Sequence, residues 1–247
     1  MTSPDLTVVL PAYMEEKHIL QSITRLIDCL DGHLITFLIR VVVDGPGDRT
    51  ADVVQEVNDP RLSVIQLENN FGKGRAVREG LANCTTEFVS YIDADLDLHP
   101  AGLVSGFRAL LNSPAEVCAA IGSKVHPDSD VFYPLSRRIL SKIYKALVRI
   151  LFSLDLNDTQ TGMKVFRRAP LEDVLPRLER SGFEFDLELL TRLARSGHQF
   201  IEVPVTLDYR FSSTVNLRSG LKTLLDTVGL AIQLRRTPAS IDRNEYR

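Results

Sequence analysis

Short runs of apolar, β-branched residues alternate with amphipathic stretches through the first half of the chain. The apolar runs are residues 6–10, 39–43, 62–67, 88–92 and 117–121. Between the first two runs, a helix is expected over residues 15–30, where apolar residues recur at helical spacing and form one stripe. Continuous apolar runs of this length are typical of strands that helices cover on both faces. The pattern therefore predicts a βαβ series and a doubly wound α/β sheet.

The second half of the chain is expected to be more helical. Its predicted elements are an amphipathic helix over 134–154, a polar loop over 157–162, a helix over 186–196, a strand over 200–205 and a terminal helix over 217–236. No internal repeat or low-complexity linker interrupts the pattern. We therefore expect a single domain over residues 1–236, followed by a flexible C-terminal tail over 237–247.

Composition and charge exclude several classes of protein. With 44% hydrophobic and 25% charged residues, the chain has the composition of a globular protein and of neither a disordered nor a membrane-embedded one. Its net charge of −3 offers no excess of positive charge to a polyanion, so we expect no nucleic-acid partner. The chain has neither a secretion signal at its start nor an uncharged apolar stretch of about 18 residues. A cytoplasmic location follows as an expectation.

Three aspartates follow the fourth predicted strand, at the edge where such sheets bind ligands. Asp93, Asp95 and Asp97 alternate along the chain, so their carboxylates are expected to point to the same side. Mg²⁺ and Mn²⁺ prefer oxygen ligands, and Mg²⁺ is commonly shared between carboxylates and a substrate diphosphate. An isolated D-x-D motif is more often a solvated acidic turn. Here the motif follows a buried strand, which favours a metal site.

Other strand ends carry residues suited to a nucleotide. Asp44 follows the second strand, where its carboxylate can accept hydrogen bonds from a base or ribose, or can cap the turn. Gly72 and Gly74 flank Lys73 ahead of a helix, so the backbone can approach a phosphate closely. The spacing is not that of a P-loop, and no dinucleotide-binding glycine motif follows any strand.

Six motifs occur in order along the chain. They are VVLPAYMEE at 8–16, GKG at 72–74, DAD at 93–95, GSK at 122–124, DTQTGMKVF at 158–166 and GFEFDLE at 182–188. Together they resemble family 2 glycosyltransferases and, within these, the polyprenyl-phosphate or dolichyl-phosphate hexose synthases. The resemblance covers residues 6–215 and favours the glucosyl over the mannosyl branch. It implies the GT-A nucleotide-diphospho-sugar transferase fold, with a mixed, mainly parallel sheet and helices on both faces.

The resemblance also implies an inverting, metal-dependent enzyme, which moves a hexose from UDP-glucose or GDP-mannose to a polyprenyl phosphate with the help of Mg²⁺ or Mn²⁺. The residues implied to bind the nucleotide sugar are Pro11, Tyr13, Glu15, Asp44, Lys73 and Asp93. Asp95 and Asp97 are the implied metal ligands, Lys124, Arg137 and Arg210 the implied contacts of the acceptor phosphate, and Asp95, Asp186 and Arg137 the implied catalytic residues.

Three positions depart from the family pattern. Asp44 stands alone where the family has paired aspartates, which leaves the choice of base open. Asp97 replaces a glutamine and adds negative charge to the metal site. Lys124 replaces an arginine and so loses the bidentate guanidinium fork.

The acceptor has more than one interpretation. A lipid phosphate has a second pKa of about 6, so it is ionised at neutral pH and needs no strong base. The alternatives are a soluble hydroxyl acceptor of glycan or phosphoglycerate type, for which Asp186 would be the base, and a protein that binds nucleotide sugars without catalysis. Basic residues from Arg138 to Arg149 line one face of the predicted helix, which suits either solvent or an anionic membrane. We expect peripheral attachment to the inner membrane face or a separate membrane protein partner, and a homo-oligomer stays open.

Overall fold

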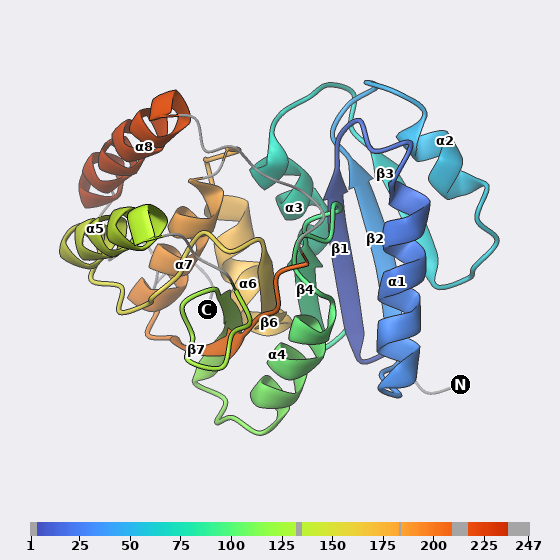
Figure 1. The fold of residues 1–247 in the computed structure, drawn as a ribbon, viewed down its shortest axis with the longest axis horizontal. Coiled ribbons are helices and arrows are strands. Elements are labelled where there is room, and N and C mark those ends of the chain that lie inside the picture. The colour runs from blue at the N-terminus through green and yellow to red at the C-terminus, as the bar shows by residue number, and fades with distance from the viewer. Residues whose placement is uncertain (1–3, 132–134, 183, 209–216, 237–247) are drawn as a thin grey trace.

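Seven strands of the computed structural model form one sheet (Figure 1). They are β1 (Leu6–Ala12), β2 (Phe37–Val43), β3 (Leu62–Gln66), β4 (Phe88–Ile92), β5 (Val117–Ser123), β6 (Met163–Arg167) and β7 (Gln199–Pro204). Their order across the sheet is β3-β2-β1-β4-β6-β5-β7. Only β6 runs antiparallel to its neighbours among these strands, so the sheet is mixed and mainly parallel. The structure describes residues 4–131, 135–182, 184–208 and 217–236.

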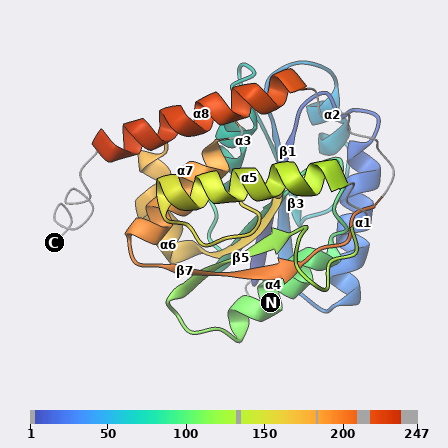
Figure 2. The ribbon, with the colours of Figure 1, turned by 60° about the vertical axis from the view of Figure 1, so that its left-hand side comes forward.

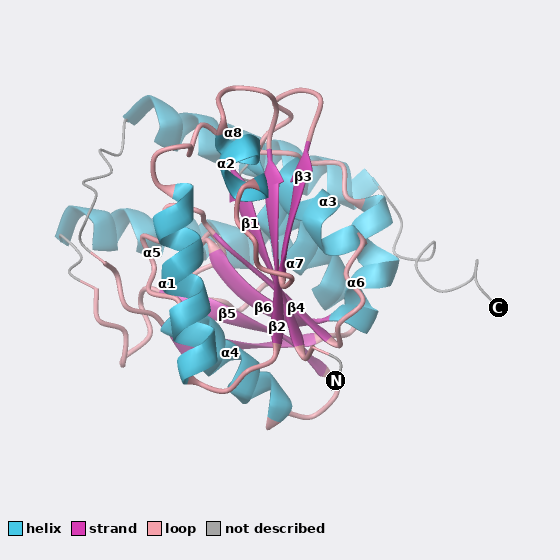
Figure 3. Ribbon diagram, turned by 90° about the vertical axis from the view of Figure 1, so that its right-hand side faces the viewer, coloured by secondary structure: helices cyan, strands magenta, loops and turns pink. Residues whose placement is uncertain are grey.

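Helices cover both faces of this sheet (Figure 3). The helices are α1 (Ile19–Gly32), α2 (Thr50–Gln55), α3 (Lys73–Ala82), α4 (Ala101–Leu111), α5 (Leu135–Phe152), α6 (Arg168–Val174), the 3-10 turn η1 (Leu175–Arg177), α7 (Phe185–Arg195) and α8 (Leu217–Arg236). One face packs against α1, α2 and α4, and the other against α3, α6 and α7. Helices α5 and α8 lie side by side beyond that second face (Figure 2).

The central strand shows why the apolar runs form this architecture. Successive side chains of β1 point to opposite faces, so Val8 and Leu10 enter one core while Val9 enters the other. All three are fully buried. A strand buried on both faces needs apolar residues at every position, which is the pattern that predicted the doubly wound sheet. The expected α/β class is therefore confirmed.

The structure differs from the predicted elements mainly around residue 165. Strand β6 and helix α6 were not expected, because β6 has the sequence MKVFR and its charges interrupt the apolar run. Helix α1 begins at Ile19, after a turn in which Met14 has a φ of 57°. Helices α5, α7 and α8 and strand β7 lie within two residues of their predicted bounds. The predicted tail, 237–247, lies outside the described residues.

No helix within the described ranges combines the length and the apolar character that crossing a bilayer requires.

Candidate active site

The carboxyl ends of β1, β2 and β4 meet at one edge of the sheet and form a cleft of about 490 Å³. Its lining residues are Pro11, Ala12, Tyr13, Glu15, Asp44, Asn70, Gly72, Lys73, Ala76, Asp93, Ala94 and Asp95. The chain crosses from β3 to β4 on the other side of β1, so the cleft lies at the point where the strand order reverses. The structure thus brings together all six residues predicted to bind the nucleotide sugar, and Asp95 lies beside them.

Asp44 holds the glycine loop that borders this cleft. Its side chain is buried, and its two carboxylate oxygens accept the N–H groups of Phe71 and Gly72, each at 2.8 Å. Gly72 has a φ of 99°, a backbone conformation that favours glycine. Asp44 therefore positions the loop ahead of α3, as the turn-capping alternative predicted. Contact between Asp44 and a base stays a prediction.

Lys73 and Asp93 form an ion pair within the cleft. Burial opposes the charge of Lys73, but the carboxylates of Asp93 and Asp186 raise its pKa above the usual value, so the ammonium group stays protonated. The backbone N–H of Asp93 donates to the Gly162 carbonyl at 3.1 Å. A Cβ atom at Gly162 would overlap the Asp93 carboxylate. Asp93 therefore holds the cation, and Gly162 fixes the place of Asp93.

Asp95 and Asp97 lie next to each other on the loop after β4. The Asp97 N–H donates to Oδ1 of Asp95 at 3.2 Å. Burial raises the pKa of both carboxyl groups, and charge repulsion adds to it, because Asp93 acts on Asp95 and Asp95 acts on Asp97. The positive charge of Lys124 lowers the pKa of both. The two carboxylates thus repel each other in a partly desolvated place.

A divalent cation fits these two carboxylates. Oδ1 of Asp97 is buried and has no hydrogen-bond partner among the described residues. No group of three histidine, cysteine or acidic side chains in the described ranges is placed to enclose a metal. Mg²⁺ usually takes only one or two carboxylates from a protein and completes its shell with phosphate oxygens and water. Asp95 and Asp97 therefore suit an ion that is shared with a diphosphate.

Tyr13 and Glu15 line the cleft from the loop that follows β1. The Tyr13 side chain is exposed, and its ring lies close to Gly47 in the turn after β2. The Glu15 N–H donates to the Thr50 hydroxyl at 2.9 Å, which ties the β1 loop to the start of α2. Burial raises the pKa of Glu15, and the negative charge of Asp95 adds to the shift. Contact of either residue with a base stays a prediction.

Only one of the three predicted acceptor contacts can be placed. The Lys124 N–H donates to Oδ2 of Asp158 at 3.3 Å, and the charge of Lys124 acts on Asp95 and Asp97. Lys124 is thus near enough to the carboxylate pair for its charge to act on both members. Arg137 belongs to α5, in the part of that helix whose side chains lie outside the described ones, and Arg210 lies outside the described residues altogether. Their contacts with an acceptor stay predictions.

Asp186 lies in a buried polar cluster that the sequence did not predict. Its Oδ1 accepts the Tyr91 hydroxyl and the Lys164 ammonium, the latter at 2.7 Å. Lys164 is fully buried on β6 and donates also to the Thr161 carbonyl at 2.7 Å. Asp186 is not among the residues that line the described part of the cleft. Its predicted role as a base stays untested, whereas its role in pairing a buried lysine is observed.

The sequence carries one signal for this cluster. Lys164 is a lysine between apolar residues of a short strand, and a fully buried lysine requires a paired acid. The acid lies 22 residues further on, in the FEFDLE motif. Sequence alone gives no distance between these two positions, because the pairing depends on how α7 packs against β6.

Comparison with known proteins identifies the family. The sequence profile described as "Glycosyl transferase family 2" matches residues 7–175. Glycosyltransferase AglD of Haloferax volcanii is 29% identical over 240 residues, which cover 94% of this chain and 37% of that protein. Dolichyl-phosphate beta-glucosyltransferase of Saccharomyces cerevisiae is 28% identical over 224 residues, which cover 81% of this chain and 66% of that protein. The chain thus spans less than two thirds of the length of these relatives.

Solved structures share the fold. Glucosyl-3-phosphoglycerate synthase of Mycobacterium tuberculosis, crystallised with Mn²⁺, UDP and glucosyl-3-phosphoglycerate, superposes with a TM-score of 0.65 at 20% identity and covers 93% of this chain and 80% of its own. Mannosyl-3-phosphoglycerate synthase of Rubrobacter xylanophilus gives 0.66 at 18% identity and covers 99% and 77%. The expected GT-A fold is confirmed. The family profile spans more than half of the chain, and the protein therefore belongs to glycosyl transferase family 2.

Proposed function

We propose that this protein transfers a hexose from a nucleoside diphosphate sugar to a polyprenyl phosphate, with Mg²⁺ or Mn²⁺ bound at Asp95 and Asp97. The observation that carries the proposal is the single cleft that gathers a fixed lysine, a glycine loop and the first of the paired carboxylates. Relatives from yeast and human that match most of the chain are named dolichyl-phosphate beta-glucosyltransferases. Their names support a lipid-phosphate acceptor.

On the donor side, the chain supplies positive charge and a close backbone. Lys73 stays protonated next to Asp93, so it can attract a diphosphate oxygen. Gly72 lines the cleft with a φ of 99° that favours glycine, so the loop backbone can approach a phosphate there, and Asp44 fixes that loop. The metal, when bound, would neutralise the charge that develops on the departing nucleoside diphosphate. Crystallisation of the structural neighbour with Mn²⁺ or Mg²⁺ supports this cofactor.

On the acceptor side, the environment of Asp186 favours a nucleophile that is already ionised. One oxygen of its carboxylate accepts bonds from both Tyr91 and Lys164, and the side chain is buried. A general base must reach the proton that it removes, within hydrogen-bond distance or through one water. A phosphate acceptor has no proton to remove at neutral pH. Lys124, whose charge acts on both carboxylates, is the cation proposed to orient the acceptor phosphate.

The acceptor would reach the protein at a membrane surface, through α5 and α8. These helices are joined by a hydrogen bond of 3.1 Å between Tyr144 and Thr227. Exposed apolar side chains on them are Ile143, Ile150, Val228 and Ile232. Apolar side chains on a helix that also carries basic residues suit the interface of an anionic membrane. We propose attachment at the cytoplasmic face, and a separate membrane protein partner or a second copy of the chain would be compatible with it.

The test is transfer itself. Purified protein is mixed with labelled UDP-glucose or GDP-mannose, Mn²⁺ and a short-chain polyprenyl phosphate, and label is measured in the organic extract. We expect a labelled lipid from one donor and none from the Asp95→Asn variant. Absence of product with every common donor would refute the proposal. Transfer to 3-phosphoglycerate or a glycan, but not to lipid phosphate, would assign the protein to the hydroxyl-acceptor alternative. Donor binding without transfer would leave a non-catalytic binding protein.

A further inference from the structure

A short segment, residues 178–182, lies against the helix that begins with Lys73, and we call this segment the strap. The carbonyl oxygen of Ser181 accepts the Gly74 N–H at 2.7 Å. The carbonyl oxygen of Leu178 accepts the Arg78 guanidinium. Both donors belong to α3. The strap is therefore attached to the first two turns of the helix that presents Lys73 to the donor cleft.

The start of α3 has little room to move independently of the strap. A Cβ atom at Gly74 would overlap Cβ of Phe185 and would lie 2.9 Å from the Ser181 carbonyl carbon. At Gly72, a Cβ atom would lie 2.6 Å from the Ser181 carbonyl oxygen. Packing as close as this transmits displacement, because protein interiors yield little. A shift of the strap would therefore shift Lys73.

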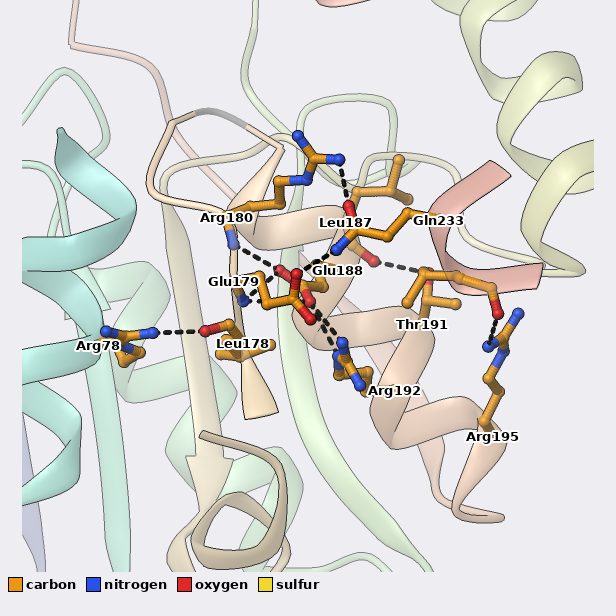
Figure 4. A network of polar contacts seen from close by, with 11 residues as sticks. Arg78, Leu178, Glu179, Arg180, Leu187, Glu188, Thr191, Arg192, Arg195 and Gln233 are labelled. Carbon is orange, nitrogen blue, oxygen red and sulfur yellow. Dashed lines mark hydrogen bonds and ion pairs between the residues drawn. The ribbon is translucent and has the colours of Figure 1, made fainter. Parts of the chain in front are cut away.

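Glu188 attaches the strap to α7. The carboxylate of Glu188 is fully buried, and its Oε2 accepts the N–H groups of Arg180 at 2.8 Å and Glu179 at 3.1 Å. Its Oε1 accepts Nε of Arg192 at 2.9 Å (Figure 4). These donors offset the cost of removing the carboxylate charge from water. The backbone of the strap is therefore held from the side opposite α3.

Gln233 on α8 completes the arrangement. Its amide oxygen accepts the Arg180 guanidinium, and its amide nitrogen donates to the Glu179 carboxylate. Figure 4 shows Gln233 beside the strap, with its bonds to the side chains of Arg180 and Glu179 drawn. Helix α8 is also bonded to α7, because the Arg195 guanidinium donates to the carbonyl oxygen of Leu234 at 2.8 Å. Helix α8 therefore contacts the strap through two consecutive side chains whose backbone N–H groups Glu188 binds.

We propose that Gln233 is a remote positioning residue for the donor cleft. It acts through Glu179 and Arg180 on the strap, and through the Ser181 carbonyl on Gly74 and the neighbouring Lys73. The position of α8 is thereby coupled to donor affinity. The effect on donor affinity rests on the proposed function. The mechanical coupling does not, because the hydrogen bond from Gly74 to Ser181 can be followed without any ligand.

The first measurement is hydrogen–deuterium exchange of the peptide that contains Gly74 and Arg75, in Gln233→Ala and in the matched control Ile232→Ala. Ile232 is the neighbouring residue on α8, and its side chain is half exposed. A residue that acts on a site through such a chain of contacts typically changes an equilibrium at that site by a factor of about two to thirty. We expect exchange at Gly74 to be about threefold faster in Gln233→Ala and unchanged in the control. A peptide from α4 serves as internal reference, because a general loss of stability would speed its exchange as well.

The second measurement is titration with UDP and with GDP, each in the presence of Mn²⁺. The dissociation constant of the nucleotide that binds should rise about threefold in Gln233→Ala, with kcat retained. If Gln233→Ala does not fold, Gln233→Glu replaces it, since glutamate keeps an acceptor for Arg180, loses the donor to Glu179 and sets a second negative charge against that carboxylate. Unchanged exchange at Gly74 in a folded variant would overturn the coupling. Exchange at Gly74 could be faster in Gln233→Ala while neither the variant nor the wild type binds a nucleotide. That result would support the coupling and refute the proposed function.

Discussion

Lys164 and Asp186 form an ion pair at 2.7 Å in the interior, and the Tyr91 hydroxyl donates to the same carboxylate oxygen. Burial raises the pKa of Tyr91 well above its usual value, and the charge of Asp186 adds to the shift, so the phenol stays a donor at all ordinary pH values. The three residues belong to β4, β6 and α7. Because β4 leads into the aspartate loop, the cluster fixes the strand from which Asp93 and Asp95 extend.

Removing one partner of this pair should destabilise the protein strongly. Lys164→Met leaves Asp186 as an uncompensated buried charge, which costs about 3–5 kcal/mol in measured cases. We expect the free energy of unfolding, measured by urea denaturation, to fall by that amount. The double variant Lys164→Met with Asp186→Leu removes both charges and should recover most of the loss. Equal instability of the single and double variants would show that the cost comes from packing.

The Asp186→Asn variant separates the two acceptor classes. Asparagine can still accept the Tyr91 hydroxyl bond, while it cannot remove a proton. Loss of a general base costs about 10²–10⁴-fold in rate. With a lipid phosphate as acceptor we expect kcat to fall by less than about tenfold, measured below the unfolding temperature of the variant. A loss of several hundredfold in fully folded protein would instead assign Asp186 as the base of a hydroxyl-acceptor enzyme.

The architecture follows from the sequence where a single periodicity decides the structure. Continuous apolar runs such as the one around Val9 predicted strands buried on two faces, and the polar residues after those strands gathered in one cleft. Strand β6 was missed because Lys164 lies in its middle, and a lysine breaks the apolar run unless its partner is known. The partner lies on another element, so its identity depends on tertiary packing.

The site shows the same limit. Residue type and strand position predicted Lys73 and Asp93, and the structure places them in one ion pair. For Asp44 the sequence offered two roles, and its two bonds to the glycine loop settle only the structural one. Glu188 gave no separate signal, because its partners include two backbone N–H groups that any residue would carry.

Gly162 should tolerate no side chain. Its Cβ would overlap the Asp93 carboxylate, so Gly162→Ala must displace Asp93 away from Lys73. Forced overpacking of this kind costs about 1–3 kcal/mol. We expect a matching fall in unfolding free energy and weaker binding of the nucleotide in calorimetry. Gly32→Ala is the matched control, because nothing lies within 4 Å of a Cβ atom there. Equal nucleotide affinity in both variants would contradict the assigned role of Asp93.

Neutralising Asp97 should stabilise the metal-free protein. Burial and the charge of Asp95 raise the pKa of Asp97 in the folded state, so the folded protein binds more protons than the unfolded chain above the ordinary value of 3.8. Stability is therefore lost as pH rises from that value through the raised pKa, and the whole penalty is present at pH 7. Asp97→Asn removes the penalty, so its Tm without metal should exceed that of the wild type at pH 7 and match it more closely near pH 4.

Bound metal should make the wild type more stable than Asp97→Asn. Mn²⁺ with the correct nucleoside diphosphate stabilises the wild type by mass action, since it binds only the folded state. Asp97→Asn loses one of the two carboxylates, so its Tm should respond less to the same addition. Asp128→Asn, at an exposed position that is not among the residues lining the cleft, is the matched control and should respond like the wild type. An equal rise of Tm in all three proteins would mean that the ion binds elsewhere, and would remove Asp97 from the metal site.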